Sequence, residues 1–391
     1  MGCCCKKRKE KIDDENPLYP DLESNQTGIE AKSETQLSEF KIKMNLDYFE
    51  SIKLLGMGSF GKVLLVKLTS ENKYYAMKVL NKKQLKLENQ ELHTKNERDL
   101  MIKIKSPFIV NIKFAFQDNV NLYLVSDFMQ GGELFFHLRK QKYFSEELAK
   151  FYAMELVLAI SHIHSNNAVY RDLKPENILL DKNGHIKLTD FGLAKIIKDN
   201  DKAYSICGST KYLAPEILLN QGYQKEIDWW SLGCVVFEML EGKTPFGNPR
   251  GKLNLSFYKR KLNFFYTESE DAKTFIKELL VINPQKRLGY GKDGSEKVKR
   301  HIFFKGIDWE KAYRKEYKPP FIPELLDELD LKYFDKMFTE EHVDLNQIRN
   351  SDDSSSNSRI NKKEDDYDYA NFSFIENDFN QELLKNKNFD Q

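Results

Sequence analysis

The residues best suited to chemistry lie in two short blocks near the middle of the chain. "YRDLKPENILL" holds Asp172, Lys174 and Asn177 within six residues, and "LTDFGLAK" holds Asp190 directly after an apolar run, His185–Leu188. A carboxylate such as Asp172 can accept the proton of a substrate hydroxyl, while Asn177 and Asp190 offer the hard oxygen ligands that Mg²⁺ prefers. Lys174 can neutralise charge on a phosphoryl group during transfer. The set favours phosphoryl transfer from ATP.

A glycine-rich stretch lies upstream of these blocks. "GMGSFGKV" places Gly56, Gly58 and Gly61 before Val63, and glycine lets backbone N–H groups approach phosphate oxygens because no Cβ intervenes. The stretch lacks the Gly-Lys-Ser/Thr ending of a Walker A loop. A strand pattern rather than a helix follows it, which argues against a dinucleotide-binding turn. By itself the pattern also fits an ordinary hairpin.

A lysine in the following strand pattern supplies a cation. Lys78 ends the apolar block "YAMK", and Glu97 in the next helical stretch offers the opposite charge. A lone lysine in a strand is usually only solvated. Pairing with Glu97 would instead orient the ammonium toward the α- and β-phosphate oxygens of a nucleotide.

The hydrophobic pattern predicts the elements that must position these residues. Residues 49–82 show apolar runs and turn residues that predict three strands of a meander. Residues 87–105 have helical periodicity, and residues 108–129 indicate two more strands around a turn. The expected fold is therefore α+β in its first part, with a small antiparallel sheet.

Beyond Gly131 the hydrophobic pattern becomes typical of helices. Ser145 stands where a helix cap is expected, and helical patterns fill residues 145–165, 228–242 and 271–282. A small β-rich part thus precedes a larger, mainly α-helical part, and the two join near Ser126–Gly132.

Composition excludes several classes of protein. The 391 residues are 40% hydrophobic and 13% aromatic, which suffices for a large core, and their net charge of +1 gives no reason to expect a nucleic-acid partner. Beyond the first five residues only Cys207 and Cys234 remain, so we expect no disulfide framework and a reducing compartment. No stretch approaches the roughly 18 apolar residues of a membrane-spanning helix.

Together, the blocks from Gly56 to Arg287 resemble the eukaryotic protein-kinase family. The resemblance implies a two-lobed kinase domain over 49–304, with an N-lobe at 49–126 and a C-lobe at 133–304. A leader at 1–48, predicted to be disordered, and a C-terminal tail at 305–391 would flank this domain. The cofactors implied are ATP and Mg²⁺.

The resemblance also assigns roles to residues. Asp172, Lys174, Lys78 and Glu97 would be catalytic, and Asn177 and Asp190 would bind Mg²⁺. Glu216 and Arg287 would form a buried structural ion pair. The nucleotide would contact Leu55, Gly56, Met57, Gly58, Ser59, Phe60, Gly61, Lys62, Val63, Ala76, Lys78 and Leu179. A hydrophobic spine in the core would consist of Met101, Ile112, Tyr170 and Phe191.

Within the family the chain resembles the AGC group of serine/threonine kinases. The usual His-Arg-Asp is here Tyr170-Arg171-Asp172, and "GGELFFHLRK" and "CGSTKYLAPE" agree with the group. The tail carries "YANFSF" at 369–374, which looks like the group's hydrophobic motif. Residues 49–345 look most like protein kinase B and the serum- and glucocorticoid-regulated kinases, and we expect no pleckstrin domain in this chain.

Regulation and substrate choice follow by the same resemblance. Ser205 and Ser373 would be phosphorylated by upstream kinases, with His93, Arg171 and Lys195 binding the Ser205 phosphate. Protein substrates would carry basic residues upstream of the accepting Ser or Thr. Those basic residues would be read by Glu133, Glu176 and Glu238. The chain departs from the group at Thr210 and Lys211, where proline and glutamate are usual, so the small pocket after the acceptor and the outermost acidic contact are both left open.

Two alternatives compete with an active serine/threonine kinase. A pseudokinase scaffold would bind nucleotide or partners without turnover, but every catalytic residue expected for turnover is present. A tyrosine kinase is disfavoured by Lys174 and by the AGC-type tail.

The first ten residues, "MGCCCKKRKE", predict a membrane anchor. Gly2 is placed for myristoylation, although Lys6 stands where the usual motif prefers Ser or Thr. Acylation of Cys3, Cys4 and Cys5 and the basic run that follows would provide the second signal that stable anchoring needs. A thiol metal site is the weaker alternative, because no histidine lies near. We expect a monomer at the cytoplasmic face of a membrane.

Overall fold

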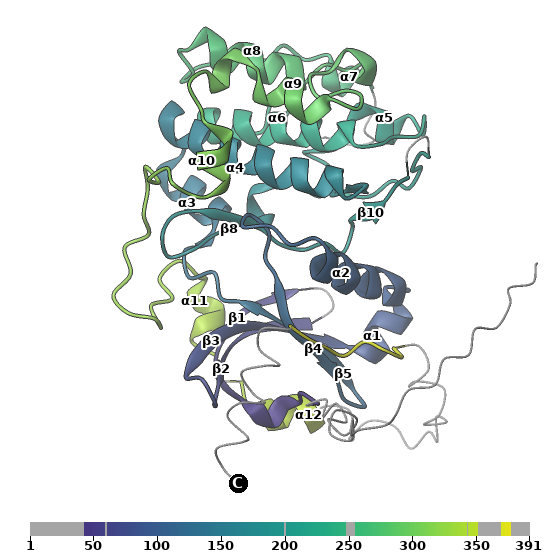
Figure 1. The fold of residues 1–391 in the computed structure, drawn as a ribbon, viewed down its shortest axis with the longest axis vertical. Helices are drawn as coiled ribbons and strands as arrows, with labels where there is room; N and C mark the ends of the chain where they lie inside the picture. The colour runs from purple at the N-terminus through teal and green to yellow at the C-terminus, as the bar shows by residue number, and fades with distance from the viewer. Residues whose placement is uncertain are drawn as a thin grey trace, which may run out of the picture. The chain divides into compact units, whose positions relative to one another are not determined.

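The glycine cluster and the strands around it form one antiparallel sheet in the first part of the chain. Its strands follow the order β1-β2-β3-β5-β4-β11 (Figure 1). They are β1 (Phe49–Gly58), β2 (Gly61–Leu68), β3 (Lys73–Asn81), β4 (Ile112–Gln117), β5 (Asn121–Asp127) and β11 (Phe374–Ile375). The computed structural model describes residues 43–58, 61–198, 201–247, 255–341, 343–350 and 369–376. The meander and the two further strands predicted from the sequence are confirmed.

Short helices flank this sheet. They are η1 (Leu46–Tyr48), α1 (Lys82–Leu87) and α2 (Glu91–Lys103). The first of these corrects a prediction, because residues 43–48 were expected to belong to a disordered leader. Met44 and Leu46 are instead buried, and the Asn45 side chain accepts a hydrogen bond from the N–H of Asp47. These apolar side chains give the segment a core to pack on.

The larger lobe is mainly helical. Its helices are α3 (Leu134–Gln141), α4 (Glu146–Ser165), α5 (Pro215–Leu218), α6 (Glu226–Glu241), α7 (Leu255–Tyr258), α8 (Glu270–Leu279) and α9 (Gly294–Lys299). The predicted cap of α4 is confirmed, since Ser145 Oγ accepts a hydrogen bond from the N–H of Leu148 at 3.3 Å. In α6 every residue from Ile227 to Glu241 is buried, as expected of a helix that is apolar on all sides and lies in the core.

Short strands and 3-10 turns between these helices carry the chemistry. The strands are β6 (Gly132–Glu133), β7 (Ala168–Val169), β8 (Ile178–Leu180), β9 (Ile186–Leu188) and β10 (Lys195–Ile196), and the turns are η2 (Pro175–Asn177) and η3 (Pro284–Lys286). β7 precedes the "YRDLKPEN" block, and β9 precedes Asp190. Each block therefore follows the end of a short strand, in two separate small sheets.

The tail leaves the large lobe and returns to the sheet. The large lobe ends with η4 (Ile302–Phe304), and the tail contains α10 (Trp309–Tyr313), α11 (Lys336–Thr339), α12 (Leu345–Asn350) and β11. Phe334 stacks on Phe128 with ring centroids 5.6 Å apart, and β11 pairs antiparallel with β4. Residues far apart in the sequence thus complete the small lobe.

Candidate active site

Asp172 lies in the loop after β7 and is held by donors on several sides. Lys174 Nζ lies 2.7 Å from Asp172 Oδ2, and Asn177 Nδ2 donates to the same oxygen at 2.9 Å. Ser209 donates to Oδ1 from its N–H at 3.0 Å and from its hydroxyl at 2.9 Å. Lys174 also donates to the Ser209 hydroxyl at 3.1 Å. The carboxylate therefore has one fixed orientation.

Asp228, at the start of α6, fixes the backbone of this loop. Its side chain is fully buried and accepts hydrogen bonds from the N–H groups of Tyr170 and Arg171, both at 2.9 Å. His164 Nε2 lies 2.8 Å from Asp228 Oδ2. Arg171 has a φ of 70°, a left-handed conformation that costs energy for a side chain of this size. No role was predicted for Asp228 from the sequence, where it only opens the block "DWWSLG".

Lys78 points from β3 toward two carboxylates. Its Nζ lies 2.7 Å from Glu97 Oε1, on α2, and 3.9 Å from Asp190 Oδ1. Burial disfavours the charge, but the two carboxylates raise the pKa of Lys78 above its usual value. The ammonium stays charged, as an ion that binds phosphate oxygens must. The predicted Lys78–Glu97 pair is present.

The residues expected to bind Mg²⁺ lie in the same cleft. Asp190 has a φ of 58° and accepts a hydrogen bond from the N–H of Gly192 at 3.3 Å, and nearly half of its side chain is exposed, 47%. Asn177 and Asp190 both line the cleft. Among the described residues no cluster of three or more His, Cys, Asp or Glu could hold a metal alone. Two oxygen donors beside a nucleotide-sized cleft suit Mg²⁺, which is usually shared with nucleotide phosphates.

The cleft itself lies between the sheet and the helical lobe and has a volume of about 410 Å³. The predicted nucleotide residues among its lining are Leu55, Gly56, Met57, Gly58, Val63, Ala76, Lys78 and Leu179. Gly61 and Lys62 lie in β2 but do not line it, and Ser59 and Phe60 lie outside the described residues. A Cβ at Gly61 would stand 1.8 Å from the carbonyl oxygen of Val79, so this glycine is required for packing against β3.

The cleft also has walls that sequence reasoning missed. Met129 and Phe128 come from the connection between the lobes, and Phe334 comes from the tail. The block "KYFDKMF" had suggested only membership of a group, because nothing local says that a tail residue returns to the cleft.

Two predicted core features are confirmed. Arg287 donates to the two carboxylate oxygens of Glu216 at 2.6 and 2.8 Å, and both residues are buried. The spine residues are also buried, and the rings of Tyr170 and Phe191 meet edge to face at 5.2 Å. These contacts position the loops but touch no reacting atom.

Two acidic side chains, Glu133 and Glu176, line the cleft, and a third, Glu238, lies near Glu176. Burial and the neighbouring Glu176 carboxylate raise the pKa of Glu133, and both residues line the cleft. Glu176 Oε2 is buried without a hydrogen-bond partner in the described part of the chain. Glu238 accepts a hydrogen bond from the Tyr212 hydroxyl at 2.6 Å, and burial raises its pKa. A cationic group would stabilise this set.

Ser205 lies beside one of its three predicted partners. Arg171 Nη1 donates to Ser205 Oγ at 2.8 Å, and Ser205 is exposed. His93 Nδ1 lies 2.8 Å from Gln90 Oε1 instead, and Lys195 is exposed in β10. Neither of these two makes a polar contact with Ser205 within the described ranges, so their role in phosphate binding stays a prediction.

The predicted hydrophobic motif contacts the small lobe. Tyr369 and Phe372 are buried, and the guanidinium of Arg98 lies 5.4 Å from the centre of the Phe372 ring. Arg98 neighbours Glu97 on α2, so the motif lies beside the helix that carries the partner of Lys78. Ser373 is exposed.

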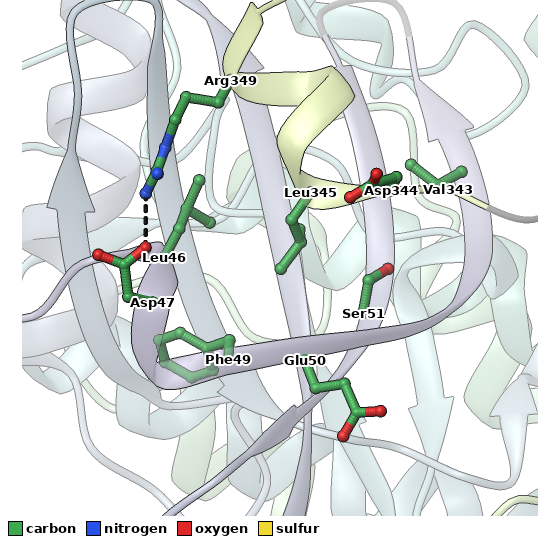
Figure 2. A pocket seen from close by; sticks show the side chains of 9 residues that line it. All are labelled: Leu46, Asp47, Phe49, Glu50, Ser51, Val343, Asp344, Leu345 and Arg349. Atoms are coloured by element: carbon green, nitrogen blue, oxygen red, sulfur yellow. Dashed lines mark hydrogen bonds and ion pairs between the residues drawn. The ribbon is translucent and has the colours of Figure 1, made fainter.

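A second cavity, of about 280 Å³, lies between the start of β1 and α12 (Figure 2). Arg349 and Asp47 form an exposed ion pair there, 2.9 Å apart, and Ser51 and Leu345 also line the cavity. It contains none of the residues predicted to do chemistry.

A nucleotide-sized cleft with this Lys–Glu pair, this aspartate loop and the Asp190 segment defines a protein kinase. The family description "Protein kinase domain" matches residues 49–304, well over half of the chain. The chain therefore belongs to the protein kinase family, and within it to the AGC group of serine/threonine kinases whose motifs it carries.

The relatives agree with this assignment. The chain is 48% identical over 302 residues to human ribosomal protein S6 kinase alpha-1, covering 76% of this chain and 41% of the relative. It is 49% identical to mouse ribosomal protein S6 kinase alpha-3, with 76% and 41% covered. It is 44% identical over 300 residues to the serine/threonine-protein kinase AtPK1/AtPK6 of Arabidopsis thaliana, with 77% and 64% covered. The chain thus spans about two fifths of the length of the S6 kinases that it matches.

Proposed function

We propose that this chain is an active serine/threonine protein kinase that transfers the γ-phosphate of ATP to protein substrates. The observation that carries the proposal is the assembled cleft. Lys78 is bonded to Glu97 and lies 3.9 Å from Asp190, while the Asp172 carboxylate is fixed by Lys174, Asn177 and Ser209. A pseudokinase scaffold would have no need of this arrangement.

Each residue then has a distinct task. Asp172 accepts the proton of the substrate hydroxyl as the oxygen attacks, and Lys174 neutralises charge on the phosphoryl oxygens. Lys78 orients the nucleotide phosphates. Asn177 and Asp190 would hold Mg²⁺, which supplies charge neutralisation of the phosphates when it is bound. Ser209 keeps the Asp172 carboxylate turned toward the acceptor.

The acidic side chains Glu133, Glu176 and Glu238 support a preference for basic substrates. Burial raises the pKa of Glu133 and of Glu238, so further cationic partners would stabilise the charged form of each. Arginine side chains upstream of the acceptor would provide them, through charge-assisted hydrogen bonds of about 1.5–3 kcal/mol each. Lys174 and Lys211 already lower the pKa of Glu133 and of Glu238, respectively, in part.

Phosphorylation of Ser205 would strengthen the site. A phosphate there adds roughly −1.5 to −2 charges next to the Arg171 guanidinium. Because Arg171 also donates to the carbonyl oxygen of Leu193 at 2.5 Å, the phosphate would tie the Asp172 loop to the segment that follows Asp190.

We further propose that the kinase acts at a membrane through Gly2 and Cys3, Cys4 and Cys5, which lie outside the described residues. None of the helices in the described ranges is long and apolar enough to cross a bilayer. Fractionation of a variant with Gly2→Ala and all three cysteines changed to Ser tests the anchor. Loss of the membrane fraction is expected, and membrane retention equal to the parent's would contradict it.

Radiolabelled phosphate transfer tests the central proposal. The parent should label a Ser/Thr peptide with upstream arginines, and should label a peptide with those arginines changed to alanine far less. Asp172→Asn, which keeps the size of the side chain, is the matched control. Equal labelling by the parent and by Asp172→Asn would sink the kinase proposal and leave a scaffold.

A further inference from the structure

The tail adds a strand to the small lobe, and this strand continues beyond the predicted hydrophobic motif. In the register of β11 with β4, Phe374 lies opposite Ala115 and Ile375 lies opposite Phe114. The N–H of Glu376 then donates to the carbonyl oxygen of Lys113 at 3.0 Å. Strand addition at a sheet edge gives backbone affinity without selecting a sequence.

The side chain of Glu376 joins this strand to two separate segments. Its Oε2 lies 2.7 Å from Lys113 Nζ, at the start of β4, and its Oε1 lies 3.0 Å from Lys105 Nζ, just after α2. Only 14% of the Glu376 side chain is exposed. A largely shielded carboxylate with two cationic partners is a stronger contact than a single surface ion pair.

The aromatic part of the tail contacts α2 itself. Lys95 Nζ lies 5.3 Å from the centre of the Tyr369 ring, and Arg98 donates to the carbonyl oxygen of Asn371. Gln117 Nε2 donates to the carbonyl oxygen of Tyr369 at 2.9 Å. Ser373, in contrast, makes none of the polar contacts that the structure describes between the tail and the small lobe.

We propose that Glu376 is a positioning residue, which holds the tail on the small lobe through Lys105 and Lys113 independently of Ser373. The two contacts bracket the region between α2 and β4. Because Lys95 and Arg98 flank Glu97, a held tail keeps α2 in the place where Glu97 meets Lys78. The unmodified chain thus has a docked tail, and a phosphate on Ser373 would reinforce the docking rather than create it.

Hydrogen exchange of the full-length, dephosphorylated protein tests this without using activity. Glu376→Gln keeps the backbone pairing of β11 but removes the charge, so exchange at Phe374 and Ile375 should accelerate about three- to tenfold. Exchange in α2 should change in the same direction. Glu340→Gln, an exposed glutamate in the same tail, should exchange like the parent, and so should Ser373→Ala. An unchanged melting temperature in Glu376→Gln shows that the fold is intact.

Two results would overturn the proposal. One is parent-like exchange of β11 in Glu376→Gln, and the other is loosening of β11 in Ser373→Ala as large as in Glu376→Gln. A second measurement, of kinase activity, rests on the proposed function. There the KM for ATP should rise in Glu376→Gln but not in Glu340→Gln. If the parent itself transferred no phosphate while exchange followed the pattern above, the kinase proposal would fail and the role of Glu376 would stand.

Discussion

The two sides of the catalytic cleft are held in different ways. On the large-lobe side, Asp172 sits on a loop whose backbone is bound by Asp228, a fully buried carboxylate. On the small-lobe side, Glu97 sits on α2, whose outer face contacts a tail segment that returns from far along the chain. The first anchor forms with the core, whereas the second depends on a docking contact.

Because of this difference, the residues that do the chemistry and the tail residues that regulate it lie on different sides of the cleft. The buried Asp228 carboxylate has no water to bind, so its free energy rises sharply if any of its hydrogen-bond donors moves away. The Asp172 loop, which supplies two of these donors, therefore has one arrangement while the lobe is folded. A docked edge strand with partly exposed ion pairs can open locally at a much lower free energy. We therefore expect regulation by the tail to act on the Lys78–Glu97 pair rather than on Asp172.

The largest expected effect comes from Asp172→Asn. Loss of the proton acceptor should reduce phosphoryl transfer by roughly 10²–10⁴-fold, the range of general base catalysis. The KM for ATP should change little, because the amide keeps the shape of the cleft. Single-turnover kinetics would measure this, and a fall of less than about tenfold would show that Asp172 is not the base.

The next largest effect is expected from Asp228→Ala, which removes the buried carboxylate that holds the Asp172 loop. Three donors, from His164, Tyr170 and Arg171, would lose their acceptor in the core. Since each unsatisfied buried donor costs about 1–3 kcal/mol, the free energy of unfolding should fall by about 3 kcal/mol or more. Denaturant titration measures it, with Asp228→Asn as the milder variant. A loss near zero would remove the contrast between the two sides of the cleft.

A smaller and different effect is expected from Phe372→Ala, which weakens the docked tail. Burial of a phenylalanine side chain is worth about 1.5–3 kcal/mol, so undocking should become at least roughly tenfold more frequent. The melting temperature should stay close to the parent's, while the KM for ATP rises. If calorimetry instead showed a loss of stability as large as that of Asp228→Ala, the tail would be part of the core.

The smallest effect is expected from Arg349→Ala, at the rim of the second cavity (Figure 2). Both members of the Arg349–Asp47 pair are largely exposed, at 44% and 69%. Such pairs contribute about 0.2–1 kcal/mol, less in high salt. Denaturation of Arg349→Ala at low and high salt would measure this. If the free energy of unfolding fell by more than about 2 kcal/mol, α12 would be an important structural contact of the small lobe.

Sequence reasoning reached the chemical residues because their roles depend on residue type and local spacing. Asp172, Asn177 and Asp190 belong to short contiguous blocks, and the strands around them follow from alternation. The role of Asp228 was missed because it binds backbone N–H groups. Nearly every residue type has such a group, so the types of the residues that donate to Asp228 give no signal in the sequence.

Contacts made where the tail returns to the small lobe could not be predicted from local sequence patterns either. Phe334 lines the cleft and Glu376 meets Lys105 only because the tail folds back over more than 200 residues. The order that places β11 beside β4 depends on which sheet edge is open, and that is a property of the assembled lobe. The same holds for Met44 and Leu46, because their burial needs partners from elsewhere in the chain.

The most direct test compares hydrogen exchange on the two sides of the cleft. The full-length parent would be set against Tyr369→Ala/Phe372→Ala, which removes the two buried rings of the tail. We predict that exchange in α2 accelerates about tenfold while residues 168–178 exchange as in the parent. Equal acceleration in both segments, or in neither, would contradict the account of one fixed and one adjustable side.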